Sequence, residues 1–250
     1  MKDLFGDKVE RAIELLRTYQ PKDGPYYGCF SGGKDSCVIK EIARLGEINV
    51  VWHYNVTTID PPELCRFIKK HHPDVIWVKP KVPFFEAAKT NGYPTFQHRW
   101  CCKIYKESST PRGSVMIFGV RAAESKRRAK AWKEVTAHTK TQQYVVSPIV
   151  NWEDYEVWQF IKSRNLPYCS LYDEGFSRLG CVGCPMASNK IQQFKRWPHI
   201  ERAWMGLFDY LYAKKERKGF TSGKEMFNCW LLNKPTPKDE ECQGILDMYS

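Results

Sequence analysis

Short apolar runs rich in β-branched residues alternate with helical patterns over the first 150 residues of this 250-residue chain. The runs expected to form strands lie at 26–30, 48–54, 75–78, 115–120 and 144–146. Helical patterns lie between most of them, at 36–45, 62–71 and 83–90. Strands that alternate with helices usually pair in parallel. The order therefore predicts an α/β fold with a mostly parallel, five-stranded sheet and helices on both faces.

The heptapeptide FSGGKDS, at 30–36, lies between the first predicted strand and a predicted helix. Two adjacent glycines let the backbone approach an anion closely and direct N–H groups at it. The partial positive charge of a helix N-terminus adds to this attraction for phosphate. The spacing differs from GxxxxGK[ST], because Lys34 follows the second glycine directly. It resembles the PP-loop, SGGxDS, of the N-type ATP pyrophosphatases, which split ATP between its α and β phosphates.

The pattern changes to helices and loops after Trp152. Helices are predicted at 152–163 and, around Pro198, at 191–217, with a glycine- and cysteine-rich loop between them. We therefore expect a PP-loop nucleotide-binding α/β domain over 1–165. A cysteine-rich loop and a helical C-terminal extension, 166–250, are expected to pack on it.

Ten cysteines are present, and four of them have the spacing of metal ligands. Cys101 and Cys102 are adjacent, and Cys181 and Cys184 form a C-x-x-C within GCVGCP. Iron–sulfur clusters and zinc both accept four thiolates. An adjacent pair is unusual for zinc, so the spacing favours iron–sulfur, with zinc as the alternative. A metal-free buried cluster is disfavoured, because GCVGCP is polar and rich in glycine.

The formal net charge of +11 suggests an anionic partner, either a nucleotide or a nucleic acid. Basic residues cluster at 126–133 and at 214–218. Each cluster is either a DNA or RNA contact surface or a solvated helix face. We favour the solvated face for the second cluster only.

No apolar stretch reaches the length of a membrane span, about 18 residues. The first sixteen residues interleave charged and apolar side chains, which predicts an amphipathic helix rather than a signal peptide. We therefore expect a cytoplasmic protein without a membrane partner. Thiols stay reduced in that compartment, so the cysteines need another explanation than disulfides.

The cysteine quartet and the heptapeptide together resemble the PAPS reductase-like family, whose iron–sulfur members bind one 4Fe–4S cluster through such cysteines. Further segments resemble the family in its order along the chain: RWCCKIYKE at 99–107, GVRAAESKRRA at 119–129, SPIVNWEDYEVWQFI at 147–161 and LPYCSLYDEGFSRLGCVGCP at 166–185. The resemblance implies an adenine nucleotide α-hydrolase-like fold. It also implies that the 119–129 stretch contacts substrate phosphate or sulfate.

The resemblance implies alternative activities within sulfur metabolism. An intact PP-loop with a cluster is most similar to the ATP-pyrophosphatase component of DNA phosphorothioation systems. There, ATP cleavage adenylates the DNA backbone before sulfur arrives from a cysteine desulfurase. The alternative is a PAPS or APS reductase, which forms sulfite with a C-terminal cysteine, here Cys242, and a thioredoxin-like donor. A third hypothesis is a regulatory or scaffold subunit that binds the nucleotide without turnover.

In the leading hypothesis the cofactors are ATP, Mg²⁺ and a 4Fe–4S cluster, with zinc as the other candidate for the cysteines. Lys34, Asp35 and Ser36 are the expected catalytic residues: Lys34 stabilises charge on pyrophosphate, and Asp35 caps the helix or orients Mg²⁺. The expected nucleotide- and phosphate-binding residues are Ser31, Gly32, Gly33, Lys34, Ser36, Arg121, Glu124 and Arg128, of which the two arginines bind the acceptor phosphate. The expected metal ligands are Cys101, Cys102, Cys181 and Cys184.

Overall fold

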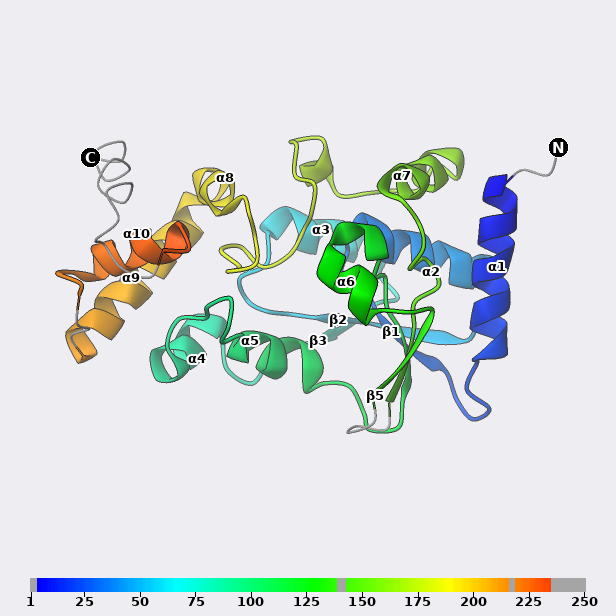
Figure 1. Cartoon of the computed structure of the whole chain (residues 1–250), viewed down its shortest axis with the longest axis horizontal. Helices are drawn as coiled ribbons and strands as arrows, with labels where there is room; N and C mark the ends of the chain where they lie inside the picture. The colour runs from blue at the N-terminus through cyan, green and yellow to red at the C-terminus, as the bar shows by residue number, and fades with distance from the viewer. Residues whose placement is uncertain (1–3, 139–142, 216–218, 235–250) are drawn as a thin grey trace. The chain divides into compact units, whose positions relative to one another are not determined.

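The computed structural model describes residues 4–138, 143–215 and 219–234. Within them, six strands form one sheet in the order β3-β2-β1-β4-β6-β5. The strands are β1 (Tyr26–Cys29), β2 (Val50–Asn55), β3 (Ile76–Val78), β4 (Val115–Ile117), β5 (Val135–His138) and β6 (Gln143–Val146) (Figure 1). Neighbouring strands are parallel from β3 through β6, and β5 pairs antiparallel with β6. The predicted α/β class is therefore confirmed.

The edge strand β5 is the strand that the sequence patterns do not predict. Its four residues, VTAH, include one large aliphatic side chain, so no apolar run marks it. Its register comes from pairing with β6, in which Val135 faces Val146 and Ala137 faces Tyr144. An antiparallel edge strand on an otherwise parallel sheet is common among folds of this class.

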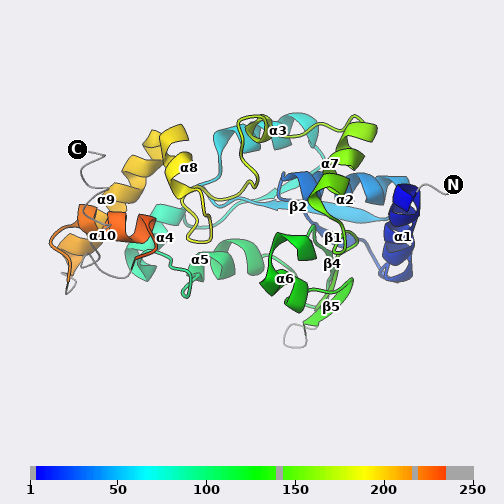
Figure 2. The same cartoon turned by 45° about the horizontal axis from the view of Figure 1, so that its top comes forward.

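Helices lie on both sides of the sheet, as predicted. Figures 1 and 2 show α2, α3 and α7 on one side and α6 on the other. Their bounds, with those of the other helical segments of this part of the chain, are α1 (Leu4–Thr18), α2 (Lys34–Leu45), α3 (Pro62–His71), η2 (Ala122–Glu124), α6 (Lys126–Ala131), α7 (Asp154–Ser163) and η3 (Ser170–Tyr172). Val38, Ile39 and Ile42 are fully buried on α2. On the other side, Trp132 follows α6 and packs against Phe118.

The chain groups into two compact units that interleave along the sequence. The first unit comprises 1–56, 61–79 and 109–179, and contains the sheet. The second comprises 57–60, 80–108 and 180–250. The predicted boundary after residue 165 lies inside the first unit. None of the described helices combines the length and the hydrophobicity needed to cross a membrane.

The second unit is helical around an aromatic core. Its described segments are α4 (Phe84–Asn91), α5 (Trp100–Cys102), the π-helical turn η1 (Lys103–Glu107), α8 (Lys190–Arg196), α9 (Pro198–Lys214) and α10 (Gly223–Leu231). The Trp204 ring stacks on the Trp230 ring, with 4.5 Å between the ring centres, and its centre lies 5.1 Å from that of the Phe84 ring. Pro198 splits the helix predicted over 191–217, because proline disfavours helical backbone at the preceding residue.

Candidate active site

The turn between β1 and α2 has a backbone that only glycine adopts readily. Gly32 has a φ of 73°, and a Cβ there would lie 2.7 Å from side-chain carbons of Leu64 and Ile68. Gly33 is the N-cap of α2, and its N–H donates to Ser31 Oγ at 3.3 Å. Ser36 Oγ donates to the Gly33 carbonyl at 2.7 Å. The predicted residues at 31–36 thus form one compact turn at the N-terminus of a twelve-residue helix.

Asp35 does not cap the helix, contrary to one of the two roles expected for it. Gly33 occupies the N-cap position and receives no side-chain cap. The Asp35 carboxylate instead accepts a hydrogen bond from Arg121 Nε and forms an ion pair with it. Because Asp35 lies inside the first turn of α2, its side chain is free to reach a partner on another element.

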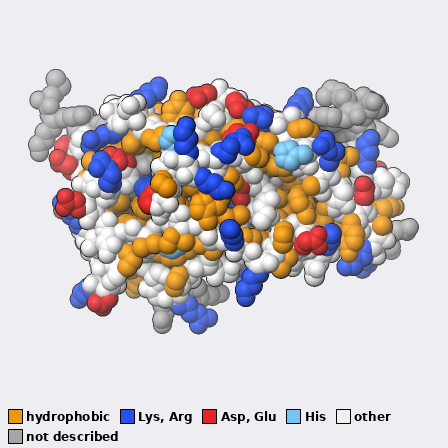
Figure 3. Space-filling view, turned by 180° about the vertical axis from the view of Figure 1, so that it is seen from behind, with side chains coloured by type: hydrophobic (Ala, Val, Ile, Leu, Met, Phe, Trp, Pro, Cys, Tyr) orange, Lys and Arg blue, Asp and Glu red, His pale blue; other side chains and the backbone are white. Residues whose placement is uncertain are grey.

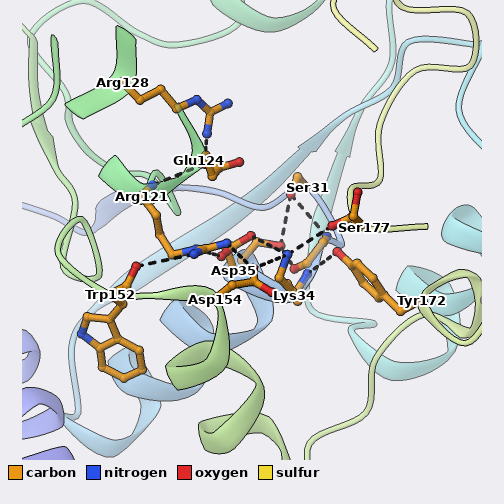
Figure 4. A network of polar contacts seen from close by, with 12 residues as sticks. Ser31, Lys34, Asp35, Arg121, Glu124, Arg128, Trp152, Asp154, Tyr172 and Ser177 are labelled. Carbon is orange, nitrogen blue, oxygen red and sulfur yellow. Dashed lines mark hydrogen bonds and ion pairs between the residues drawn. The ribbon is translucent and has the colours of Figure 1, made fainter. Parts of the chain in front are cut away.

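Four charged side chains form a network beside this turn, as Figure 4 shows. Lys34 Nζ lies 3.2 Å from Asp154 Oδ1 and 3.9 Å from Asp35 Oδ2. Arg121 bridges the two carboxylates through its ion pair with Asp35 and a 2.7 Å contact to Asp154. Lys34 and Arg121 are 5% and 3% exposed, so both cations are held by the protein rather than by water. The network is a charge-assisted assembly that a ligand has to share or rearrange.

Burial and neighbouring charges act in opposite directions on Asp154. Burial favours its neutral form, but the charges of Lys34 and then of Arg121 outweigh burial and lower the pKa of this carboxyl. Asp154 is therefore ionised at neutral pH. Its side chain is 60% exposed, so it also faces solvent.

Arg121 and Arg128 do not point at the same place. Arg128 forms an ion pair with Glu124, whose carboxylate also accepts the Arg121 N–H at 3.4 Å. In Figure 4 the Arg128–Glu124 pair lies apart from the Lys34 network, joined to it through Arg121. Burial, followed by the charge of Arg178, lowers the pKa of Arg128. Glu124 thus accepts from the guanidinium of Arg128 and from the backbone N–H of Arg121, while the Arg121 guanidinium is held by Asp35 and Asp154.

Three partners of Lys34 lie in segments that resemble the family but are not among the predicted site residues. Asp154 lies in the first turn of α7. An acidic side chain at that position stabilises any helix through the helix dipole, so its presence does not point to Lys34. The Tyr172 hydroxyl accepts the Lys34 backbone N–H at 2.9 Å. The Ser177 carbonyl accepts from Lys34 Nζ at 3.2 Å. No spacing rule links these residues to the turn.

The four predicted cysteine ligands line one cavity in the second unit. Its volume is about 30 Å³, and its walls include Phe84, Tyr105 and Trp204. Thr57, which is itself bonded to Asp60, accepts from Cys181 Sγ at 3.4 Å. Among the described residues, no three His, Cys, Asp or Glu side chains are already arranged to hold a metal ion. The convergence of four thiols on one space nevertheless matches the donor set of an iron–sulfur or zinc site.

The loop that carries Cys181 and Cys184 is fixed from behind by α8 and α9. Gly183 has a φ of 75°, and a Cβ there would lie 2.6 Å from Trp204 Nε1. Its N–H donates to Gln193 Oε1 at 2.9 Å, and Trp204 Nε1 donates to the Val182 carbonyl at 3.2 Å. These contacts explain the glycine predicted to form a tight knuckle between the two cysteines.

The thiols differ in acidity. A hydrogen bond shared with Cys101, helped against burial by the charges of Lys106 and Arg99, lowers the pKa of Cys102 to about 6. The same shared hydrogen bond and burial raise the pKa of Cys101. Burial is also the main cause of the raised pKa of Cys181. Cys102 therefore ionises more readily than Cys101 and Cys181.

The basic segment after Arg121 is exposed. Lys126, Arg127 and Lys130 on α6, and Lys133 beyond it, are all exposed. Figure 3 shows that Lys and Arg side chains on one face of the molecule are scattered among acidic and hydrophobic ones.

Cys242, the candidate reductase nucleophile, lies outside the described residues.

A mostly parallel sheet with helices on both faces and a glycine turn after its central strand β1 defines an open-sheet α/β protein. The chain belongs to the phosphoadenosine phosphosulfate reductase domain family, whose model matches residues 26–187. This confirms the family predicted from the motifs. A solved structure with the same fold is phosphoadenylyl-sulfate reductase from Candida auris, with a TM-score of 0.54 and 16% identity. The match covers 74% of this chain and 97% of that one.

Two curated relatives differ in how much of them the chain covers. An uncharacterized protein of Methanocaldococcus jannaschii is 29% identical over an alignment of 268 positions, which covers 98% of this chain and 62% of that protein. An adenosine 5'-phosphosulfate reductase of Bacillus cereus is 27% identical over an alignment of 217 positions, which covers 80% of this chain and 92% of the reductase. The chain thus spans about three fifths of the archaeal relative.

Proposed function

We propose that this chain binds ATP at the glycine turn and cleaves it between the α and β phosphates to adenylate an acceptor. The observation that carries the proposal is the turn itself, in which Gly32 adopts a left-handed backbone between the hydroxyls of Ser31 and Ser36 at the start of α2. Such a turn suits the oxygens of a pyrophosphate group, which accept from backbone N–H groups and hydroxyls.

The reaction needs charge stabilisation more than covalent chemistry. An oxygen of the acceptor forms a bond to the α phosphorus, and the bond from that phosphorus to the β-phosphate oxygen breaks. Pyrophosphate leaves with the electron pair of the broken bond. The Lys34 ammonium and the N-terminus of α2 stabilise the charge that develops on it.

The carboxylates of Asp35 and Asp154 are the residues that would hold Mg²⁺. Both are hard oxygen donors, and Asp154 faces solvent. The ion would supply neutralisation of the pyrophosphate charge. Lys34 and Arg121, which now pair with these carboxylates, then turn to phosphate oxygens.

A backbone phosphate of DNA is the acceptor we propose. The exposed cations of α6 and the net charge of +11 support an extended anionic partner. Arg128 and Arg178 repel one another, so an anion bound there would relieve that repulsion. Sulfur would then reach the adenylated phosphate from a cysteine desulfurase.

The cysteine cavity is proposed to hold a 4Fe–4S cluster through Cys101, Cys102, Cys181 and Cys184, with zinc as the alternative occupant. Four thiols around one cavity fit this donor set, and the ready ionisation of Cys102 favours metal binding. A bound cluster would relay sulfur or fix the loop that carries Cys181 and Cys184.

A second candidate function is reduction of a sulfonucleotide to sulfite, with Cys242 as nucleophile and a thioredoxin-like electron donor. The similarity to a Bacillus cereus adenosine 5'-phosphosulfate reductase, which covers 92% of that enzyme, favours it. Sulfite formation from APS or PAPS with thioredoxin tests this candidate. Loss of that activity in Cys242→Ser would establish the nucleophile.

The leading proposal is tested by measuring pyrophosphate release from Mg²⁺–ATP with and without DNA. We expect DNA-dependent release that falls by about 10²–10³-fold in Lys34→Met, the range for removing one preorganised charge-stabilising group. Lys70→Met, an exposed change on α3, is the control. Sulfite formation without pyrophosphate release would replace the proposal with the reductase. ATP binding without either turnover would leave a sensor or scaffold subunit.

A further inference from the structure

The Tyr172 hydroxyl binds inside the glycine turn. It accepts the Lys34 N–H at 2.9 Å, and Lys34 is the first residue of α2. The N–H groups of a helix's first turn have no carbonyl partner within the helix. They are the donors that a phosphate at this helix N-terminus would use. Tyr172 therefore occupies one of the donors that the proposed pyrophosphate site requires.

The hydroxyl also lies close to the other groups of the turn. A Cβ built on Gly33 would lie 3.3 Å from the Tyr172 hydroxyl oxygen and 3.4 Å from Ser31 Oγ. The ammonium of Lys34 lies 5.5 Å from the centre of the Tyr172 ring and donates to the Ser177 carbonyl. One short segment, 170–177, thus engages both the backbone amide and the ammonium of Lys34.

We propose that the Tyr172 hydroxyl stands in for a pyrophosphate oxygen at the α2 N-terminus and is displaced when the pyrophosphate group of a nucleoside triphosphate binds. The inference rests on the proposed function, because it concerns the same phosphate site. Tyr172 is then a residue that sets the affinity of the turn for polyphosphate. A ligand with no β phosphate would leave this contact in place.

The exchange is favourable because the two acceptors differ in charge. A phosphate oxygen accepts a charge-assisted hydrogen bond, about twice as strong as one to a neutral hydroxyl. Burial raises the pKa of Tyr172, so its phenol stays neutral and remains the weaker acceptor. Displacement of the segment also frees the Lys34 ammonium from the Ser177 carbonyl for the phosphate.

The segment can be perturbed at the hydroxyl alone. The Tyr172 ring packs edge-on against Trp158 at 5.1 Å, a contact that phenylalanine keeps. Tyr168 offers a matched control, because its ring also meets Trp158, at 5.3 Å, while its hydroxyl donates to Asp173 at 3.1 Å. Both substitutions remove one hydroxyl from the same aromatic group.

The test is isothermal titration of the whole chain with inorganic pyrophosphate in the presence of Mg²⁺. We expect Tyr172→Phe to bind pyrophosphate about fivefold more tightly than the wild type, because one net hydrogen bond no longer has to be broken. Tyr168→Phe is expected to bind like the wild type. Unchanged or weaker binding by Tyr172→Phe would overturn the inference, as would equal tightening in both variants.

Turnover, measured separately, distinguishes this inference from the proposed function. Tighter pyrophosphate binding by Tyr172→Phe without ATP cleavage by the wild type would keep the inference and reject the pyrophosphatase. Cleavage of ATP by the wild type, with pyrophosphate binding unchanged in Tyr172→Phe, would keep the pyrophosphatase and reject the inference. If neither protein binds pyrophosphate, the inference fails, and the proposed function fails with it only if the wild type also releases no pyrophosphate from ATP.

Discussion

The glycine turn and the cysteine cavity satisfy their polar groups in different ways. At the turn, Lys34 and Arg121 are paired with Asp35 and Asp154, so the protein supplies both signs of charge itself. In the cavity, four thiols meet aromatic walls, and Lys106 is the lysine that lines the same space. The charged groups of the turn are paired with one another, whereas the four thiols of the cavity are donor atoms of the kind that bind a metal.

This difference bears on what each site takes. A ligand at the turn exchanges with existing partners, so binding there is a competition that charge decides. Soft thiol donors that converge on one space suit a resident metal group. We therefore expect the turn to keep its structure without a ligand, and the cavity to depend more strongly on its occupant.

The largest expected effect concerns the occupant of the cavity. Protein purified without oxygen should contain iron and sulfide and show the visible absorption of a 4Fe–4S cluster, and Cys184→Ser should lose both. Four-thiolate ligation leaves no spare ligand, which is the physical reason for a complete loss. Metal analysis and the ultraviolet–visible spectrum provide the measurement.

Cys65→Ser is the control for that experiment, because Cys65 lies on α3 in the first unit and outside the cavity lining. It should keep the iron content of the wild type. A colourless wild-type protein that carries zinc would contradict the iron–sulfur assignment. Such a result would still leave the contrast between the two sites intact.

The second prediction concerns the network at the turn. Arg121→Ala removes a 3% exposed guanidinium and leaves Asp35 with a weaker counter-charge. Breaking a buried ion pair costs about 3–5 kcal/mol, and because Asp154 is exposed, the expected loss of unfolding free energy is about 3 kcal/mol. Urea denaturation at neutral pH measures it.

Arg127→Ala is the matched control, since Arg127 is exposed on α6. It should change the unfolding free energy by less than about 0.5 kcal/mol. If Arg121→Ala were equally mild, the turn would not be held together by its own ion pairs. The two sites would then be alike in needing a ligand.

Local patterns predict the parts of both sites that are contiguous in sequence. The glycine turn follows from SGG between an apolar run and a helical pattern, and the cysteine quartet follows from its spacing. The partners of Lys34 do not follow, because Tyr172 lies 138 residues further along the chain and a hydroxyl acceptor has no spacing rule. The expected cap at Asp35 fails for a related reason: Arg121, from a distant segment, attracts that carboxylate.

The fold shows the same limit. The parallel strands carry apolar runs, so they are predictable one by one. β5 is defined by its pairing with β6 rather than by its own four residues. The interleaved units, in which 57–60 and 80–108 group with the C-terminal helices, likewise follow from contacts distant in sequence.

The smallest predicted effect tests whether Asp154 belongs to the network as a charge. Its pKa is lowered in the folded protein, because the charges of Lys34 and Arg121 outweigh burial. A lowered folded pKa gives stability that is present above the unfolded value, about 3.9, and is lost as pH falls through the folded pKa. The stability difference between wild type and Asp154→Asn should therefore shrink from pH 7 to pH 3.

The size of that difference is limited by solvent. Asp154 is 60% exposed, so water screens the pair and the contribution at pH 7 should stay below about 1 kcal/mol. Urea unfolding at several pH values gives the measurement, with the exposed Asp23→Asn as control. A difference that stays constant down to pH 3 would mean that Asp154 acts through packing. The network at the turn would then reduce to Asp35 with its two cations, Arg121 and Lys34, and Lys34 would keep its contacts to Tyr172 and Ser177.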